Sequence, residues 1–381
     1  MKLKRLTALL LSVMMVLSLA ACGGGGDTKD DSASGDLSGK TIIIGNITPV
    51  TGAQAAYGLA ITNSIQLAID EINAAGGILG ATVKLSTKDD QGTPAEAVSG
   101  FNSLLSEGAA AIIGATLSSC TSAITSLADD EGIVLVTPSS TADSITTTDD
   151  YVFRSCFKDS FQGEMVAAYA KDQGWTKAAV LYATGDTYSS GLHDSFVKAA
   201  EKYGIEIVCE QSSSDTGAVD FSSQLATIAA SGADMLFAPY YYDAVGPKII
   251  PQAREAGFKG AIMGCDGFDG TQDYTTGDLS AYENVYFTNH YSPEDSSEIV
   301  QSYVKNYTEK YGSESMNALG ALAYDAMYMV KQAIEKAGSI DHEAIRDAMS
   351  GMHYVGVTGD MTLDAVSYTH LRAHETRHDL V

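Results

Sequence analysis

The feature that most constrains this chain is an alternation of short apolar segments with longer segments of helical periodicity. In the first helical segment, isoleucines and alanines recur at helical spacing from Ile61 to Ile72, and Gly76 and Gly77 end the pattern. Apolar runs typical of strands lie at residues 41–44, 83–85, 110–113 and 133–136. Strands joined in this way by helices run parallel and are covered on both faces. The first part of the chain is therefore predicted to form a doubly wound α/β lobe.

A second series of the same kind begins after residue 157. Helices are predicted at 161–173, 192–203, 221–230 and 246–256, and strands at 178–182, 206–210, 235–238, 261–264 and 285–288. Helices at 298–311, 318–337 and 342–349 follow. We expect two doubly wound parallel-sheet lobes joined by a multi-strand hinge, with a cleft between them. The predicted lobes are residues 40–157 plus 289–355, and residues 158–288 plus 356–366.

The N-terminus has the pattern of an export signal. Basic Lys2, Lys4 and Arg5 precede an apolar run over residues 8–21, which is shorter than the ~20 residues that a membrane helix needs. The run ends in Leu19-Ala20-Ala21-Cys22, which resembles a bacterial lipobox. Residues 1–21 are therefore predicted to be a signal peptide, and Cys22 the lipidated first residue of the mature protein.

The expected location follows from this signal. Residues 22–39 are rich in Gly, Asp and Ser and are predicted to be a flexible linker. We expect an exported protein on the outer or periplasmic side of a bacterial cytoplasmic membrane, which it contacts through the lipid anchor only. The chain has 48 acidic and 23 basic residues, a formal charge of −25, which excludes nucleic acid as a partner.

Polar residues follow several predicted strands, at the edge where parallel sheets bind ligands. Hydroxyl-rich turns at 116–121 and 137–141 lie at or near helix N-termini, where free amides favour a carboxylate. N-capping alone would explain any one of these hydroxyls. In the second lobe, Tyr188, the run Tyr240-Tyr241-Tyr242-Asp243 and Asp266 bring aromatic rings and acids that suit an ammonium group. Together these turns predict a zwitterionic ligand held between the lobes.

Residues from about 40 to 364 resemble the amino-acid-binding proteins of branched-chain amino-acid ABC transporters, which have the type I periplasmic binding fold. The matching segments are Ile44-Gly45, Thr51-Gly52, Tyr57-Gly58, the run from Ala68 to Gly77, Asp89-Asp90 with Pro94 and Ala97, Phe153-Arg154, Phe161-Gln162-Gly163, Asp220-Phe221-Ser222, Gln252-Ala253-Arg254 and Tyr324-Asp325-Ala326. The resemblance implies capture of an extracytoplasmic amino acid by hinge closure and its delivery to an ABC permease, with no chemistry and no cofactor.

The resemblance also assigns site residues. Ser118, Ser139 and Thr141 fall on the family's carboxylate contacts, Tyr57 and Tyr188 on its aromatic residues, and Tyr242 and Asp266 on its ammonium ligands. The family often has Glu where this chain has Asp266, so this carboxylate reaches less far. Phe268 and Leu319 are candidates for an apolar part of the pocket, which favours an aliphatic ligand, although the sequence does not name the amino acid.

Two other functions were weighed. A ligand-sensing receptor subunit of the same fold, binding amino acids or amides, would need a membrane helix or a cytoplasmic module. A hydrolase would need a nucleophile turn near His193 or His290, and the sequence has none there. We therefore expect no enzyme activity.

Four cysteines beyond Cys22 leave the redox state open. Cys120, Cys156, Cys209 and Cys265 allow three full pairings, among which Cys120 with Cys156 is conceivable, and buried free thiols are as compatible with the sequence. No spacing of these cysteines indicates a metal site.

The last residues, 367–381, differ in composition from the rest of the chain. His374 to His378 fits the HExxH pattern of zinc proteases, but only three residues follow it, so no third ligand lies downstream. The segment resembles a translated sequencing-adapter tail, and we expect neither a metal nor a role in the fold.

Overall fold

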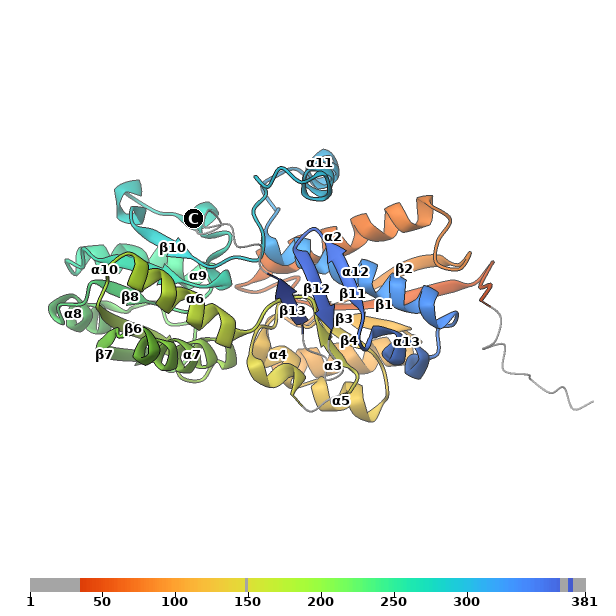
Figure 1. Cartoon of the computed structure of the whole chain (residues 1–381), viewed down its shortest axis with the longest axis horizontal. Helices are drawn as coiled ribbons and strands as arrows, with labels where there is room; N and C mark the ends of the chain where they lie inside the picture. The colour runs from red at the N-terminus through yellow and green to blue at the C-terminus, as the bar shows by residue number, and fades with distance from the viewer. Residues whose placement is uncertain (1–34, 148–149, 364–368, 373–381) are drawn as a thin grey trace, which may run out of the picture.

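The computed structural model describes residues 35–147, 150–363 and 369–372 and contains two α/β lobes lying end to end (Figure 1). The first lobe is built on a five-stranded parallel sheet of order β2-β1-β3-β4-β5. Its strands are β1 (Thr41–Thr48), β2 (Thr82–Asp89), β3 (Ala111–Ile113), β4 (Leu135–Thr137) and β5 (Val152–Arg154). The strands β3, β4 and β5 are completely or almost completely buried, and all of their residues except Thr137 and Arg154 are apolar.

Helices cover this sheet as the periodicity predicts. They are α2 (Ala55–Ala74), α3 (Pro94–Ser106), α4 (Ser118–Ser122), α5 (Thr125–Asp130), α12 (Ala318–Ala337) and α13 (His342–Met349), with α11 (Glu298–Tyr311) beside α2. α2 and α12 pack closely because Gly320 has no side chain. A Cβ atom at Gly320 would lie 2.8 Å from the Ser64 hydroxyl and 3.0 Å from the Ala60 carbonyl oxygen.

The second lobe repeats the design with a parallel sheet of order β10-β9-β8-β6-β7. Its strands are β6 (Lys177–Ala183), β7 (Glu206–Ser213), β8 (Met235–Phe237), β9 (Ala261–Gly264) and β10 (Val285–Phe287). Its helices are α6 (Asp159–Asp172), α7 (Thr187–Tyr203), α8 (Ser222–Ala230), α9 (Tyr242–Ala244) and α10 (Ile250–Glu255), with a π-helical turn at Val245–Ile249. α7 begins where the Asp186 carboxylate accepts a hydrogen bond from the Ser189 amide at 2.8 Å.

The predicted fold class is confirmed, and the hinge lies where the chain passes between the lobes. Within the described residues it crosses after β5, at 155–158, and again after β10, at 288–297 (Figure 1). The carboxyl ends of the strands of both sheets face the cleft beside these crossings.

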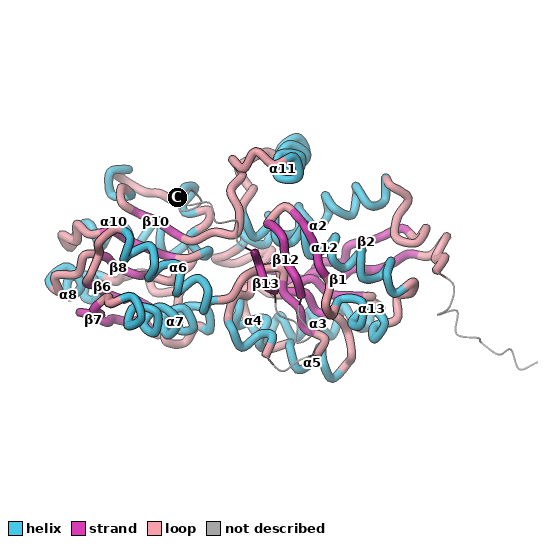
Figure 2. The backbone as a smooth tube through the Cα atoms, in the orientation of Figure 1, coloured by secondary structure: helices cyan, strands magenta, loops and turns pink. Residues whose placement is uncertain are grey.

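The predicted placement of the C-terminal residues is wrong in one respect. Residues 356–366 were assigned to the second lobe, but β11 (His353–Gly356), β12 (Gly359–Leu363) and β13 (Thr369–Arg372) form an antiparallel sheet on the first lobe, beside α12 (Figure 2). The buried Asp325 carboxylate of α12 accepts hydrogen bonds from the Val357 and Thr358 amides, at 2.9 and 2.8 Å, and from the Thr358 hydroxyl at 2.6 Å. These bonds attach the sheet to α12.

Several sequence predictions concern residues outside the described part of the chain. These include the signal peptide, Cys22, most of the linker, and the pattern from His374 to His378. The backbone of residues 369–372 pairs with β12, and the assignment of residues 367–381 to an adapter-like tail stays a prediction. Cys120, Cys156 and Cys265 are buried, Cys209 is half-buried, and all four are free thiols. None of the helices in the described ranges is long and apolar enough to cross a membrane.

Candidate ligand-binding site

The predicted site residues come together in a narrow cleft between the lobes. The first lobe contributes residues from α2, from the segments after β3 and β4, and from α12. The second contributes residues from α7 and from the segments after β8 and β9. The lining residues are Tyr57, Thr116, Leu117, Ser118, Ser139, Tyr188, Tyr241, Asp266, Gly267 and Leu319.

The wall from the first lobe is a set of hydroxyls fixed by the backbone. The Ser139 hydroxyl donates to the Thr116 carbonyl at 2.8 Å, and the Thr116 hydroxyl is 2.8 Å from that of Thr48. Ser118 begins α4, where the first amides have no acceptor within the helix. Hydroxyl and amide donors together can hold a carboxylate on this wall.

The wall from the second lobe is centred on Asp266, which is 3% exposed. One carboxylate oxygen, Oδ1, accepts hydrogen bonds from Gln162 Nε2 and from the Tyr188 hydroxyl, both at 2.9 Å. The other, Oδ2, lies 3.1 Å from His290 Nε2. The Asp266 amide donates to Gln162 Oε1 at 3.1 Å. This carboxylate is therefore held in one orientation, facing the cleft.

Gly267 allows the close packing behind Asp266. A Cβ atom at this position would lie 2.7 Å from the Tyr188 hydroxyl and 2.8 Å from the Tyr240 carbonyl oxygen. The Gly267 amide donates to that same Tyr188 hydroxyl at 2.8 Å. A larger residue would displace Tyr188 and, with it, one of the donors to Asp266.

Tyrosine rings form the remaining side of the cleft. Tyr188 and Tyr241 are stacked, with centroids 5.0 Å apart and planes at 17°, and Tyr57 meets Tyr241 edge-on at 6.4 Å. Burial raises the pKa of all three phenols well above the ordinary value, so they stay neutral hydrogen-bonding groups.

Hydrogen bonds between the lobes hold the cleft closed. The Tyr57 hydroxyl donates to the Gly267 carbonyl at 2.7 Å. The Tyr242 hydroxyl donates to the Ala53 carbonyl at 2.9 Å and accepts from the Ala56 amide at 3.2 Å. Gln54 Nε2 donates to Asp243 Oδ1 at 2.9 Å. All of these bonds link α2, or the residues just before it, to the second lobe.

The structure places most, but not all, of the predicted residues in the cleft. Ser118, Ser139, Tyr57, Tyr188, Asp266 and Leu319 line it. Tyr242 does not, because its hydroxyl is bonded to the backbone of the first lobe at the cleft entrance. Phe268 packs in the core of the second lobe, against the β9 residue Gly264. Thr141 is buried behind the wall, where its carbonyl accepts from Arg154 Nη1 and the Asp159 amide.

Four lining residues were not predicted: Thr116, Leu117, Tyr241 and Gly267. Thr116 and Leu117 belong to a hydroxyl-rich turn that the sequence had singled out. Tyr241 belongs to the run of three tyrosines, in which the side chain that faces the ligand could not be chosen from sequence.

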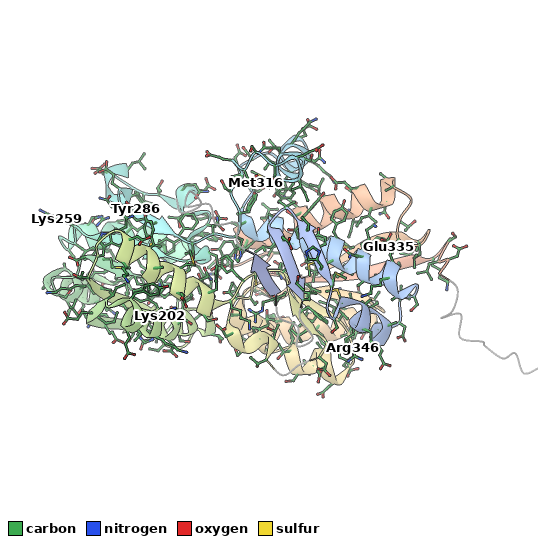
Figure 3. The ribbon with its side chains drawn as sticks, viewed as in Figure 1. Lys202, Lys259, Tyr286, Met316, Glu335 and Arg346 are labelled. Atoms are coloured by element: carbon green, nitrogen blue, oxygen red, sulfur yellow. The ribbon has the colours of Figure 1, made fainter. Side chains whose placement is uncertain are left out.

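A wider cavity of about 470 Å³ adjoins the cleft at Tyr57 and lies at the boundary of the lobes. Its walls carry Tyr242, Tyr274 and Asp273 from the second lobe, and Glu314 and Met316 from the segment before α12. Met316 is labelled in Figure 3, between α11 and the junction of the lobes.

Two lobes with a narrow cleft between them, hydroxyl-bearing turns on one wall and a carboxylate on the other are the arrangement of a binding protein that closes around a small ligand. The chain belongs to the periplasmic binding protein family, whose profile matches residues 41–375. This family membership implies an extracytoplasmic location, and its members are binding proteins, not enzymes.

Individual relatives align with most of this chain. A Leu/Ile/Val-binding protein homolog of Brucella melitensis is 31% identical over 312 residues, which are 80% of this chain and 81% of the relative. A leucine binding protein, LivK of Thermotoga maritima, has a TM-score of 0.80 at 31% identity and covers 86% of this chain and 93% of its own. The branched-chain amino acid transporter substrate binding protein LivJ of Streptococcus pneumoniae, solved in complex with isoleucine, has a TM-score of 0.79 at 32% identity, with 87% and 94% covered.

Proposed function

We propose that this protein captures an extracytoplasmic amino acid, branched-chain or otherwise aliphatic, and delivers it to an ABC permease. The observation that carries the proposal is the placement of Ser118 and Asp266 on opposite walls of one enclosed cleft. Hydroxyl and amide donors on the first wall suit the ligand carboxylate, and Asp266 suits its ammonium group. Burial of either charge without such a partner would be costly.

The remaining walls of the cleft support an amino-acid ligand with an aliphatic side chain. Leu319, Leu117 and the faces of Tyr57 and Tyr241 surround the cleft between the two charged ends. These surfaces offer apolar contact to an aliphatic group and no further charge. The relatives named for leucine, isoleucine and valine, and the neighbour solved with isoleucine, support the same class of ligand.

Calorimetric titration and thermal shift test the proposal. L-Leucine, L-isoleucine and L-valine should bind, and a ligand at 100 times its Kd should stabilise the protein by about 2.7 kcal/mol. Isovalerate lacks the ammonium group and isopentylamine lacks the carboxylate. D-Isoleucine has both groups but the opposite configuration at Cα. All three controls should bind far more weakly than the L-amino acids. Absence of any shift with the three L-amino acids, in a folded sample, would contradict the proposal.

The same proposal includes a lipid anchor at Cys22, based on the lipobox-like sequence before it. The full-length protein, expressed in a bacterial host with the lipidation pathway, should partition into detergent and incorporate labelled palmitate. Cys22→Ala should remove the label. Equal labelling of wild type and variant would contradict lipidation at this residue.

A further inference from the structure

His290 lies where both hinge crossings meet the ligand-binding wall. It follows β10 on the second crossing, and its side chain is 1% exposed. Its ring stacks on Phe157 of the first crossing, with centroids 3.7 Å apart and planes at 23°. Its Nε2 atom lies 3.1 Å from Asp266 Oδ2. One buried ring thus contacts both crossings and the carboxylate proposed to bind the ligand.

The hydrogen bonds to Asp266 leave one direction for a ligand. An ionised carboxylate has about four acceptor positions. Gln162 and Tyr188 occupy two of them on Oδ1, and His290 occupies one on Oδ2. The position that is left is on Oδ2, so a ligand ammonium and His290 would share the same oxygen atom.

The contacts of the ring indicate which of its nitrogens carries the proton in the neutral form. An ionised Asp266 only accepts hydrogen bonds, so Nε2 carries the proton. Nδ1 is buried and has no hydrogen-bond partner within the described residues. In the neutral ring Nδ1 is therefore an acceptor, whereas in the protonated ring both nitrogens are donors.

Other titratable groups face this pair from every neighbouring element. Asp269, after β9, acts electrostatically on His290, and burial raises the pKa of Asp269. Asp159, at the start of α6, lies near Asp266, and burial raises the pKa of Asp159 well above its ordinary value. Tyr188 and the thiols of Cys156 and Cys265 also face Asp266, and burial raises the pKa of each of them. Raised pKa values favour the neutral forms of these groups, which leaves Asp266 as the carboxylate whose charge a ligand ammonium would meet.

We propose that His290 is a positioning residue that couples ligand binding to a proton. In its neutral form it orients Asp266 and leaves the negative charge available to the ligand ammonium. When His290 is protonated, its own positive charge neutralises that oxygen and opposes the ammonium, so ligand affinity falls at acidic pH. The inference rests on the proposed function, because it requires an amino-acid ligand at Asp266.

Calorimetry with L-isoleucine between pH 5 and 8, the range in which histidines titrate, tests this coupling. For the wild type, Kd should rise as pH falls, by up to about tenfold per pH unit for one competing proton. Binding at pH 6 should release protons, detected as a heat that differs between buffers of low and high ionisation enthalpy. His290→Gln retains an N–H donor that cannot titrate, and should bind at pH 7.5 with a flat pH profile.

Two further variants separate positioning from structure. His290→Phe keeps a ring to stack on Phe157 but removes the donor, and should weaken binding about tenfold at pH 7.5. His193→Gln is the matched control, because His193 stacks on Tyr182 and pairs with Asp194 and Glu210, away from the cleft. This variant should keep the pH profile of the wild type. Circular dichroism at each pH checks that every sample is folded.

The outcomes are distinguishable. Wild-type binding without proton release at pH 6, or the same pH slope in wild type and His290→Gln, would overturn the role of His290 and leave the proposed function intact. No binding of L-isoleucine, L-leucine or L-valine at any pH would overturn the proposed function and this inference together.

Discussion

Tyr242 and Ala53 join the two lobes at the entrance of the cleft, where the tyrosine hydroxyl donates a hydrogen bond to the alanine carbonyl at 2.9 Å. The same hydroxyl accepts from the Ala56 amide, so one side chain of the second lobe contacts two backbone groups at the start of α2. Both bonds join the second lobe to the first. Tyr242 therefore stabilises the closed state and is not among the residues that line the cleft.

Tyr242→Phe should weaken ligand binding without changing the fold. Loss of the two hydrogen bonds should cost about 1 kcal/mol of closure, which raises Kd about fivefold, mainly through faster dissociation. Stopped-flow fluorescence would measure the dissociation rate. Tyr240→Phe is the matched control, because its hydroxyl bonds to Ser213 within the second lobe. Equal dissociation rates in both variants would refute a closing role for Tyr242.

Asp266→Ala should reduce affinity for L-isoleucine by about 2–5 kcal/mol, the range for removal of one partner of a buried charge pair. The ligand ammonium would then be buried without a counter-charge. The free energy of unfolding should also fall, because Gln162, Tyr188 and His290 would lose a buried acceptor. Calorimetry gives the affinity and circular dichroism gives the fold. Wild-type affinity in a folded Asp266→Ala sample would remove the residue from the site.

Ser118→Ala should have a smaller effect, on the order of 1 kcal/mol. The amides at the start of α4 and the Ser139 hydroxyl remain available to the ligand carboxylate. Ser119→Ala, at the next position of the same helix, is a suitable control because Ser119 is not a lining residue. If both variants bind as the wild type does, the carboxylate lies elsewhere in the cleft.

Asp325 gives the stability of the protein a defined pH dependence. Burial raises the pKa of this carboxyl to about 6 in the folded state, above the ordinary value of 3.8. A raised folded-state pKa means that the folded protein binds the proton more tightly, so this contribution to stability is full below pH 4 and is lost as pH rises through 6. The shift of about two units corresponds to roughly 2–3 kcal/mol.

Denaturant unfolding of wild type and Asp325→Asn at pH 4, 5, 6 and 7 measures this contribution. The wild type should lose its stability advantage over the variant by roughly 2–3 kcal/mol between pH 4 and 7. The side-chain amide introduced by Asp325→Asn does not titrate, so this pH dependence of the difference arises from proton binding by Asp325 in the wild type. A constant difference between the two proteins across this range would contradict the prediction.

The fold was largely predictable because hydrophobic periodicity is a local property. The segment from Ile61 to Ile72 carries the period of a helix, and the buried strands are mostly apolar, so both could be recognised without tertiary information. The placement of residues 356–363 could not be predicted in this way. It depends on Asp325, a carboxylate that contacts amides more than 30 residues further along the chain.

The site residues that come soon after the end of a strand could be predicted from the sequence. Ser118 and Asp266 each come directly or shortly after a strand, and parallel sheets bring such positions together. The position of Tyr241 in the cleft lining could not be predicted, because β8 ends at Phe237, after which no strand alternation fixes the direction of a side chain. His290 was considered only as a possible member of a catalytic triad, since its contact with Asp266 spans 24 residues and two elements.

The entrance bonds of Tyr242 and Gln54 use residues that do not line the cleft, and their partners are Ala53, Ala56 and Asp243. Part of the closure is therefore encoded outside the cleft lining, whereas the Tyr57–Gly267 bond joins two lining residues. Substitutions at Leu319 or Tyr241 can change the accepted side chain while the entrance bonds stay intact. This separation makes the chain a suitable scaffold for engineered biosensors, in which one closing movement reports on ligands selected by redesign of the cleft alone.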